Sequence, residues 1–336
     1  AMPPLNDMDV LTNCLGFIAI MENGKLVGYN LTAGGGMGMT HNNAKTYPRV
    51  ADVIGFFTPE HIEEVAKSVL TVHRDFGDRG DRRHARLKYV LAERGVEWFR
   101  GEVEERAGIT LAEPRMFDFE RQGDLFGWHE AANGSWFLGL YVLSGRIKGA
   151  MKTALQQIVQ THRPEVRLTP TQNLLLCGVP TEDKDKINSI LSEHGLAVEE
   201  VEQGTLLERG AMACPALPTC GLSLAESERY LPEFLGVVEN LLEDAGLADE
   251  QIIVRMTGCP NGCARPYMAE LGIVGKSPGK YAIYLGGNKN STRLARLFNQ
   301  NVPVNEMAAT LGPIVSRYKN ERETGEGFGD FCARAI

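Results

Sequence analysis

Four of the seven cysteines form two close pairs of a kind that binds metal. The pairs are Cys214 with Cys220 and Cys259 with Cys263, separated internally by five and three residues and from each other by 38. Structural zinc sites usually place two to four residues between paired ligands. The spacing of these pairs favours a cubane [4Fe–4S] cluster, around which four thiolates on glycine- and proline-containing loops converge. A zinc site stays open as an alternative.

The other candidate ligands follow no comparable pattern. Cys14, Cys177 and Cys332 lie in apolar or terminal contexts and are expected to be core or incidental thiols. The seven histidines share no metal-ligand spacing and are interpreted as surface or core residues. The glycine-rich loop 34–38 lacks the Lys-Ser/Thr that completes a phosphate-binding loop. We therefore interpret it as a close backbone approach to the core or to a cofactor.

Helices and strands next to the cysteines must position them. The first pair precedes a helix predicted over 223–245, and the second pair lies between a strand predicted over 252–256 and a short helix within 260–271. The first turn of a helix leaves backbone N–H groups free, and these can stabilise the negative charge of a cluster. A helix predicted over 82–93 places Arg82 and Arg86 at i, i+4 positions on one face.

Two segments near the ends of the chain share one order of elements. Near the start, a hairpin over 15–32 precedes the glycine-rich loop, a polar stretch and a helix that begins at Pro59. Near the end, a hairpin over 272–286 precedes a glycine turn, a basic helix and a further helix through Met307. We interpret these segments as two copies of one unit. An α/β half of its own, with helices over 151–162 and 182–194, precedes the second copy.

Composition excludes several classes of protein. The 336 residues are 43% hydrophobic and 23% charged, as in an ordinary globular chain, and carry a net charge of −8. Nothing in that balance indicates a basic surface for nucleic acid or for an anionic membrane. No apolar run approaches the roughly 18 residues of a membrane span, and the first residues do not have the pattern of a signal peptide. We expect a cytoplasmic protein.

At the cysteines the sequence resembles a known family, the siroheme-containing sulfite and nitrite reductases. The resemblance rests on the pattern C-x5-C followed, after a long spacer, by TGCPNGCARP at 257–266. It extends over essentially the whole chain, and the tail together with RYLP at 229–232 is more similar to assimilatory sulfite reductases than to nitrite reductases. Further matches are TQNL at 171–174, Asn30 with 34–36 and KTY at 45–47, Asp81-Arg82 with Arg86 and KY at 88–89, and GEGFGDF at 325–331.

The resemblance implies a fold as well as a chemistry. It implies an α+β protein of mixed sheets flanked by helices, built from a pseudo-duplicated module with ferredoxin-like halves. The domains would be the end of the first repeat (1–110), a ferredoxin-like half domain (111–205) and a cluster- and siroheme-binding domain (206–336). Because the family's sulfite-gripping arginines and lysines find no counterpart, the chain looks truncated, and we expect it to be inactive or poor in cofactor alone.

The family's site residues transfer onto matching positions of this sequence. Cys214, Cys220, Cys259 and Cys263 would ligate the [4Fe–4S] cluster, and Cys263 would also bridge to the siroheme iron as its axial ligand. Siroheme carries eight carboxylates, which require cations and amide donors around them when buried. The candidates for that role are Arg82, Arg86, Gln172, Asn173, Asn261 and Arg265.

The implied reaction is the six-electron reduction of sulfite to sulfide. A coupled cluster and haem can deliver electrons one at a time without releasing intermediates. The implied electron donor is a separate flavoprotein reductase subunit, and neither nucleic acid nor a membrane is expected as a partner. A ferredoxin-dependent sulfite or nitrite reductase is the nearest alternative. A non-catalytic electron-transfer or zinc-stabilised module is the alternative from a different class.

Overall fold

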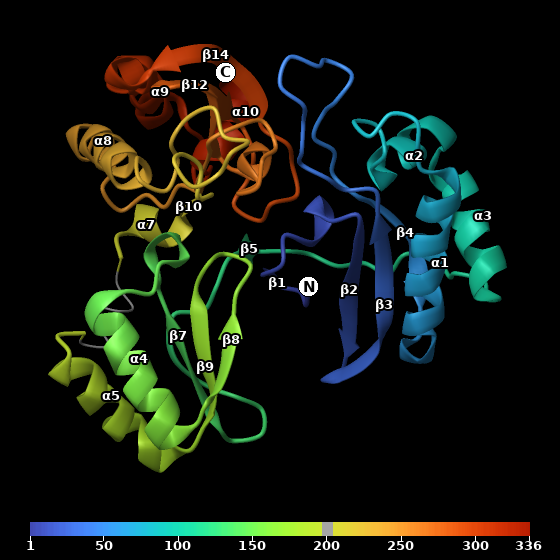
Figure 1. Ribbon diagram of the computed structural model, residues 1–336, viewed down its shortest axis with the longest axis horizontal. Coiled ribbons are helices and arrows are strands. Elements are labelled where there is room, and N and C mark those ends of the chain that lie inside the picture. The colour runs from blue at the N-terminus through green and yellow to red at the C-terminus, as the bar shows by residue number, and fades with distance from the viewer. Residues whose placement is uncertain (197–203) are drawn as a thin grey trace.

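The computed structural model describes residues 1–196 and 204–336, which form three α/β units around a central N-terminal segment (Figure 1). In the first unit, three antiparallel strands form one sheet with α1, α2 and α3 packed on one face. Asn23 and Gly24 have φ of 51° and 74°, as a tight hairpin turn between the first two strands requires. These elements are β2 (Leu15–Glu22), β3 (Lys25–Ala33), β4 (Asp52–Phe57), α1 (Ile62–Phe76), α2 (Leu87–Arg94) and α3 (Val96–Ala107).

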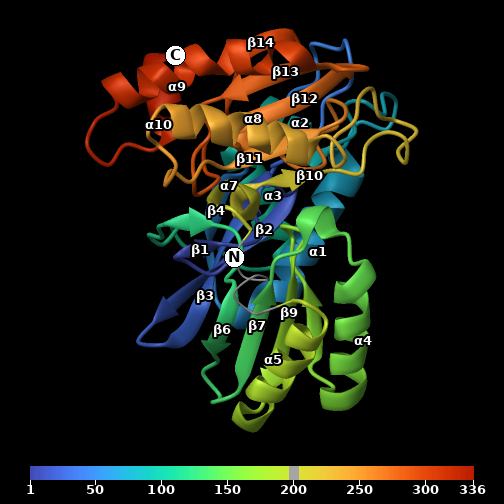
Figure 2. The same cartoon turned by 90° about the vertical axis from the view of Figure 1, so that its left-hand side faces the viewer.

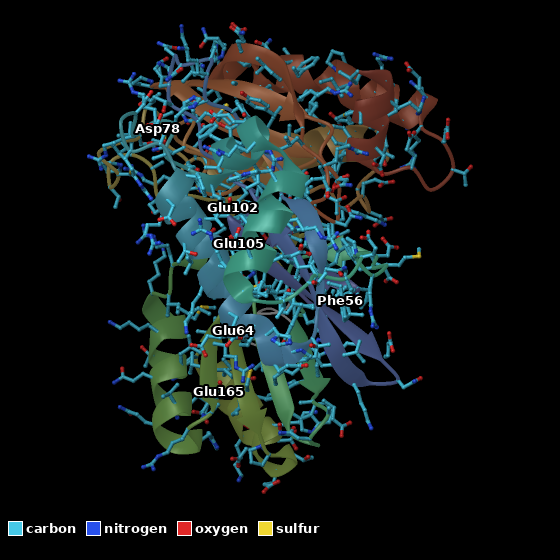
Figure 3. All side chains as sticks on the ribbon, turned by 90° about the vertical axis from the view of Figure 1, so that its right-hand side faces the viewer. Phe56, Glu64, Asp78, Glu102, Glu105 and Glu165 are labelled. Carbon is cyan, nitrogen blue, oxygen red and sulfur yellow. The ribbon has the colours of Figure 1, made fainter. Side chains whose placement is uncertain are left out.

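The core of the first unit lies between this sheet and its helices. In α1, Val65, Val69 and Val72 recur at helical spacing and are buried against sheet residues such as Leu31. The outer side of the helical layer is charged and includes Glu64 on α1 and Glu102 and Glu105 on α3 (Figure 3), with Glu102 paired to Arg106. The helices therefore bury one apolar face and expose a charged one.

The second unit is a four-stranded antiparallel sheet in the order β6-β7-β9-β8, with α4 and α5 against it. The fold confirms the predicted succession of helix, two strands and helix in this region. Leu138 and Leu176 from the sheet pack against Ile158 and Ile187 from the two helices. The elements are β6 (Gly127–Glu130), β7 (Trp136–Leu140), α4 (Gly149–His162), β8 (Glu165–Leu168), β9 (Leu174–Val179) and α5 (Lys184–Glu193).

The third unit holds a five-stranded mixed sheet in sequence order (Figure 2). Its first three strands run parallel and its last two pair antiparallel, and α8, α9 and α10 bury their apolar faces in its core. The elements are α7 (Leu206–Gly210), β10 (Met212–Ala213), α8 (Leu231–Asp244), β11 (Val254–Thr257), β12 (Leu271–Ser277), β13 (Lys280–Leu285), β14 (Arg296–Pro303), α9 (Met307–Glu321) and α10 (Phe328–Ala335).

The predicted duplication is visible in the order of elements. Strands β2, β3 and β4, a 3-10 turn (Pro59–His61) and the 15-residue α1 correspond to β12, β13, β14, a 3-10 turn (Val304–Glu306) and the 15-residue α9. The basic helix predicted before Met307 is wrong, because part of that segment forms β14, the counterpart of β4. Backbone pairing with β13 outweighs helix propensity in this polar edge strand.

Two other predicted helices begin later than expected. The helix predicted over 82–93 begins at Leu87, because the Asp78 and Asp81 side chains accept hydrogen bonds from nearby backbone N–H groups and hold the preceding residues in turns. Arg82 and Arg86 therefore do not share a helix face. The helix predicted over 223–245 begins at Leu231, and residues 223–230 form turns.

The N-terminal segment lies between the three units, as its label in Figures 1 and 2 shows. Its strand β1 (Leu5–Asn6) pairs in parallel with β5 (Arg121–Gln122). The Asn6 side chain accepts from Val10 N at 2.8 Å and donates to Asn290 O at 2.9 Å, which joins the segment to the third unit. The domain ranges 1–110, 111–205 and 206–336 stay a prediction. None of the described helices has the length and apolarity to cross a membrane.

Candidate cluster site

Parallel pairing of two strands brings the cysteine pairs together. Ala213 on β10 lies opposite Met256 on β11. Cys214 follows the first of these strands directly, and Cys259 follows the second after one residue, Gly258. Because parallel strands end at the same edge of a sheet, the two cysteine loops start side by side.

Gly258 is the point at which the two cysteine loops touch. Its carbonyl oxygen accepts from Leu224 N at 2.9 Å and from Ala225 N at 3.0 Å, and its N–H lies 3.4 Å from Cys214 Sγ. A Cβ at this position would lie 2.0 Å from Ser223 Oγ and 2.5 Å from Ala225 O. The contact therefore requires glycine, because any side chain would push the loops apart.

The four thiols influence one another electrostatically. Desolvation raises the pKa of Cys259, and the thiolates of Cys214 and Cys220 raise it further against the opposing Asn261 N–H. Desolvation followed by the other three thiolates raises the pKa of Cys263. The backbone N–H donors near the sulfurs thus come from Gly258 and Asn261 in turns. The predicted helix N-termini are not there, since only a three-residue 3-10 turn (Pro266–Met268) follows the second pair.

Four thiolates are the ligands that a [4Fe–4S] cluster uses, and they are also a known zinc donor set. Among the described residues, no group of three or more His, Cys, Asp or Glu could hold one metal ion. Ligands of a single zinc crowd within about 2.3 Å of it, whereas a cubane spreads its iron atoms over separate corners, and four thiolates can ligate it from further apart.

The four cysteines differ in exposure. Cys259 is buried, Cys214 and Cys220 are half-buried, and Cys263 is exposed. The turn that carries Cys263 is held by a hydrogen bond from Tyr267 Oη to Pro260 O at 3.0 Å. Within the turn, Gly262 adopts a φ of +64°. A second group could therefore reach the sulfur of Cys263 more easily than that of Cys259.

The glycine-rich loop of the first unit packs on this turn. Met39 N donates to Pro260 O at 2.9 Å, and a Cβ at Gly38 would lie 3.3 Å from Asn261 O. The fully buried Lys88 holds the loop by donating to Gly36 O (3.1 Å), Gly38 O (2.8 Å) and Tyr47 O. Desolvation lowers the pKa of Lys88 to about 8. The structure confirms the close backbone approach predicted for this loop.

The residues predicted to contact siroheme fall into different environments. Arg86 and Asn261 are exposed and meet at Gly38, where a Cβ would lie 3.0 Å from Arg86 Nη1. Arg82 is exposed in a turn and does not share a helix face with Arg86. Arg265 is largely buried, and its guanidinium donates to Asp9 and to Pro170 O. The siroheme contacts of these residues stay a prediction.

Gln172 and Asn173 already have protein partners. Gln172 brackets the peptide of Ala213, donating to its carbonyl at 2.8 Å and accepting from its N–H at 3.3 Å. Because Cys214 is the next residue, this amide positions a predicted cluster ligand. Asn173 is buried and bonds Asp124 Oδ2 at 2.7 Å and Val142 N at 2.9 Å. In this structure Gln172 therefore connects the second unit to the third, and Asn173 forms hydrogen bonds with Val142 and Asp124.

Several residues near the site carried no signal in the sequence. Asp9 lies in an unremarkable N-terminal segment and Arg255 on an apolar strand, yet they pair in the protein interior. The sequence predicts a core or incidental thiol at Cys14, but its Sγ lies 3.8 Å from Nη2 of Arg86, one of the candidate siroheme ligands. A polar cavity of about 830 Å³ lies elsewhere and is lined by none of the four paired cysteines. Its lining residues come from segments 121–126, 206–210, 250–253 and 319–327, together with Lys289.

Thiol labelling tests the assignment of ligands and bystanders. In the metal-free chain we expect an alkylating reagent to modify the exposed and half-buried thiols before Cys332, because burial raises the pKa of Cys332 to about 12. After cluster assembly, mass spectrometry should find the four paired cysteines protected and the half-buried Cys14 and Cys177 unchanged in reactivity. Equal labelling of all seven thiols before and after assembly would contradict the assignment.

Two family models match the chain. The model described as "Nitrite and sulphite reductase 4Fe-4S domain" matches residues 1–111, and the model described as "Nitrite/Sulfite reductase ferredoxin-like half domain" matches residues 129–194. The first range is the first copy of the repeated unit and contains a single cysteine, Cys14. The four paired cysteines therefore lie outside both matched ranges.

Curated relatives match the whole chain. The protein is 51% identical to the "Sulfite reductase [NADPH] hemoprotein beta-component" of Myxococcus xanthus and 48% identical to the protein of that name from Geobacillus kaustophilus, over 100% of this chain in both cases. The chain spans 60% and 59% of their lengths. The solved structure of the Mycobacterium tuberculosis NirA protein is 26% identical, with a TM-score of 0.83 over 98% of this chain and 61% of that one.

Proposed function

The chain belongs to the nitrite and sulfite reductase family, and we propose that it is the cluster-binding portion of a sulfite reductase hemoprotein. The observation that carries this proposal is the convergence of the two cysteine loops at Gly258. Strand pairing places Cys214 and Cys259 at one sheet edge, and the contact made by Gly258 closes the loops on each other. The names of the curated relatives support sulfite as the substrate.

The proposed enzyme has two cofactors, and residues of this chain are proposed to hold each of them. Cys214, Cys220, Cys259 and Cys263 would hold a [4Fe–4S] cluster, and the exposed Cys263 would bridge it to siroheme. When bound, the cofactor pair supplies electrons one at a time for the reduction of sulfite to sulfide by six electrons and six protons. The chain's own part is to position: Gly258 and Asn261 direct N–H groups toward the thiols, and Lys88 fixes the loop beside Cys263.

The siroheme carboxylates would be met by residues at the edge of the cysteine turn. Arg86 and Asn261 are exposed there and present a guanidinium and an amide beside Gly38. Arg82, Gln172, Asn173 and Arg265 complete the proposed set. Of these, the last three would have to exchange protein hydrogen bonds for cofactor contacts, which makes Arg86 and Asn261 the better supported pair.

Partners of the proposed enzyme follow from the same reasoning. A flavoprotein subunit is the proposed electron donor, since the relatives' names specify NADPH. The acidic balance of the chain, with a net charge of −8, mildly disfavours docking of a strongly acidic ferredoxin. The absence of any disulfide among the seven cysteines supports the cytoplasm as the site of the reaction.

Absorption spectroscopy of anaerobically purified protein tests the cofactor proposal. We expect the chain to be poor in cofactor as purified and, after anaerobic reconstitution, to contain iron and acid-labile sulfide and to absorb broadly in the visible, with bands in the red if siroheme is bound. A colourless protein without iron or sulfide after anaerobic reconstitution would refute the proposed function. Zinc found in place of iron would favour a zinc-stabilised module.

Nitrite is the second candidate substrate, because the descriptions of the matching family models name both anions. Titration of the siroheme-loaded protein with each anion separates the two. The shift of the siroheme absorption measures binding in each titration. We expect sulfite to bind more tightly than nitrite. Tighter binding of nitrite would assign the chain to nitrite reduction.

A further inference from the structure

Three charged side chains from distant parts of the sequence meet in the interior. Asp9 and Arg255 are each 1% exposed, and Arg265 is 18% exposed. One oxygen of Asp9, Oδ2, lies 2.8 Å from Arg255 Nη2 and 2.5 Å from Arg265 Nε. A single buried carboxylate is thus shared by two guanidinium groups.

The two arginines flank the second cysteine pair. Arg255 lies on β11, four residues before Cys259, and Arg265 lies two residues after Cys263. By holding both guanidinium groups, Asp9 joins the two ends of the segment that carries these cysteines. The N-terminal segment therefore closes a clasp, defined as Asp9 with Arg255 and Arg265, across the base of the cysteine turn.

The clasp also reaches the second unit. Arg255 Nη2 donates to Gln122 Oε1 at 2.7 Å, and Arg265 Nη2 donates to Pro170 O at 3.0 Å. Arg265 adopts a φ of +55°, a left-handed conformation that a residue with a side chain adopts only when its surroundings hold it there. Its bonds to Asp9 and Pro170 supply that restraint.

The negative charge of Asp9 is what makes the arrangement stable. Burial opposes its ionisation, but the two guanidinium groups hold the pKa of Asp9 below its usual value. Without the carboxylate, two guanidinium groups would face each other in the interior without a counter-charge, which is strongly unfavourable. In that case we expect the two ends of the segment 255–265 to move apart.

We propose that Asp9 is a positioning residue that, through Arg255 and Arg265, sets the conformation of the Cys259–Cys263 turn at the cluster. This inference rests on the proposed function for its relevance to a cluster. It gives Arg265 a role in supporting the turn, beside the siroheme contact proposed for it.

Alkylation of the metal-free 336-residue chain tests the clasp without a cofactor. Cys259 is buried, so its alkylation requires the turn to open. Asp9→Ala should raise the rate of Cys259 alkylation on the order of tenfold or more, and Asp9→Asn, which keeps the size and one oxygen, should raise it less. Val103→Ala is the control, because it removes buried side-chain atoms from the core of the first unit without touching the turn.

The reduction potential of the assembled cluster provides a second measurement. Asp9→Asn removes a negative charge near the cluster, which favours the more negatively charged reduced state. We expect a more positive midpoint potential in Asp9→Asn and an unchanged potential in Val103→Ala. The sign of this shift follows from the lost charge, so the potential reports how close Asp9 lies to the cluster, and the alkylation rate reports its effect on the turn.

The outcomes separate this inference from the proposed function. If Asp9 variants match Val103→Ala in Cys259 alkylation at equal denaturant stability, the clasp does not position the turn and the inference is wrong. If the wild-type chain assembles no cluster, the proposed function fails, and the alkylation rates still decide whether the clasp exists. Faster alkylation together with a raised potential would support both.

Discussion

Cys259→Ser is expected to lose most or all cluster binding while the protein stays folded. Iron–sulfur clusters are held by thiolates, and a serine hydroxyl is a far weaker ligand at neutral pH. Cys259 is only 7% exposed, so water cannot easily take the place of the lost sulfur. Because loss of an outer-shell partner alone costs ten- to a hundredfold in metal affinity, we expect about a tenth or less of the wild-type iron, measured with acid-labile sulfide after anaerobic reconstitution.

Two further variants make the Cys259 result interpretable. Cys263→Ser should retain more iron than Cys259→Ser, since the exposed position admits solvent as a replacement ligand. Cys177→Ser changes a half-buried thiol on β9 in the second unit and should bind the cluster like the wild type. Full iron content in Cys259→Ser, or equal loss in Cys177→Ser, would contradict the ligand set.

Gly258→Ala is expected to destabilise the third unit and to impair cluster assembly together. The added methyl would lie 2.0 Å from Ser223 Oγ, 2.5 Å from Ala225 O and 2.6 Å from Ala216 Cβ. Overpacking of this kind costs about 1–3 kcal/mol and occasionally more, and we expect the upper end because a backbone oxygen cannot move alone. Denaturant unfolding of the metal-free chain measures the cost, and iron uptake measures the second effect.

Gly236→Ala is the matched control for this prediction. It adds the same methyl group within α8, where nothing lies within 4 Å of the new Cβ. Replacing glycine by alanine inside a helix stabilises by about 0.5–1 kcal/mol. A loss of stability in Gly236→Ala as large as in Gly258→Ala would show that the cysteine loops have no special intolerance of a side chain.

Local sequence patterns predicted much of the fold. The hairpin over 15–32, the helix that begins at Pro59 and the helix over 151–162 all depend on residues close in the chain, and the structure contains them as β2 with β3, α1 and α4. Prediction failed where long-range pairing or local side-chain bonds competed with helix propensity. The segment that forms β14 gains its conformation from β13, and the turns before Leu87 are held by the side chains of Asp78 and Asp81.

The sequence by itself determined the identity of the candidate ligands and the duplicated order of elements, because spacing and periodicity are properties of neighbouring residues. Only the tertiary structure decided that Gly258 joins the two cysteine loops, that Lys88 holds the glycine-rich loop on the turn, and that Asp9 reaches Arg265 across 256 positions. Buried charges and close backbone contacts arise between segments remote in sequence, so no local pattern can specify which partners will meet.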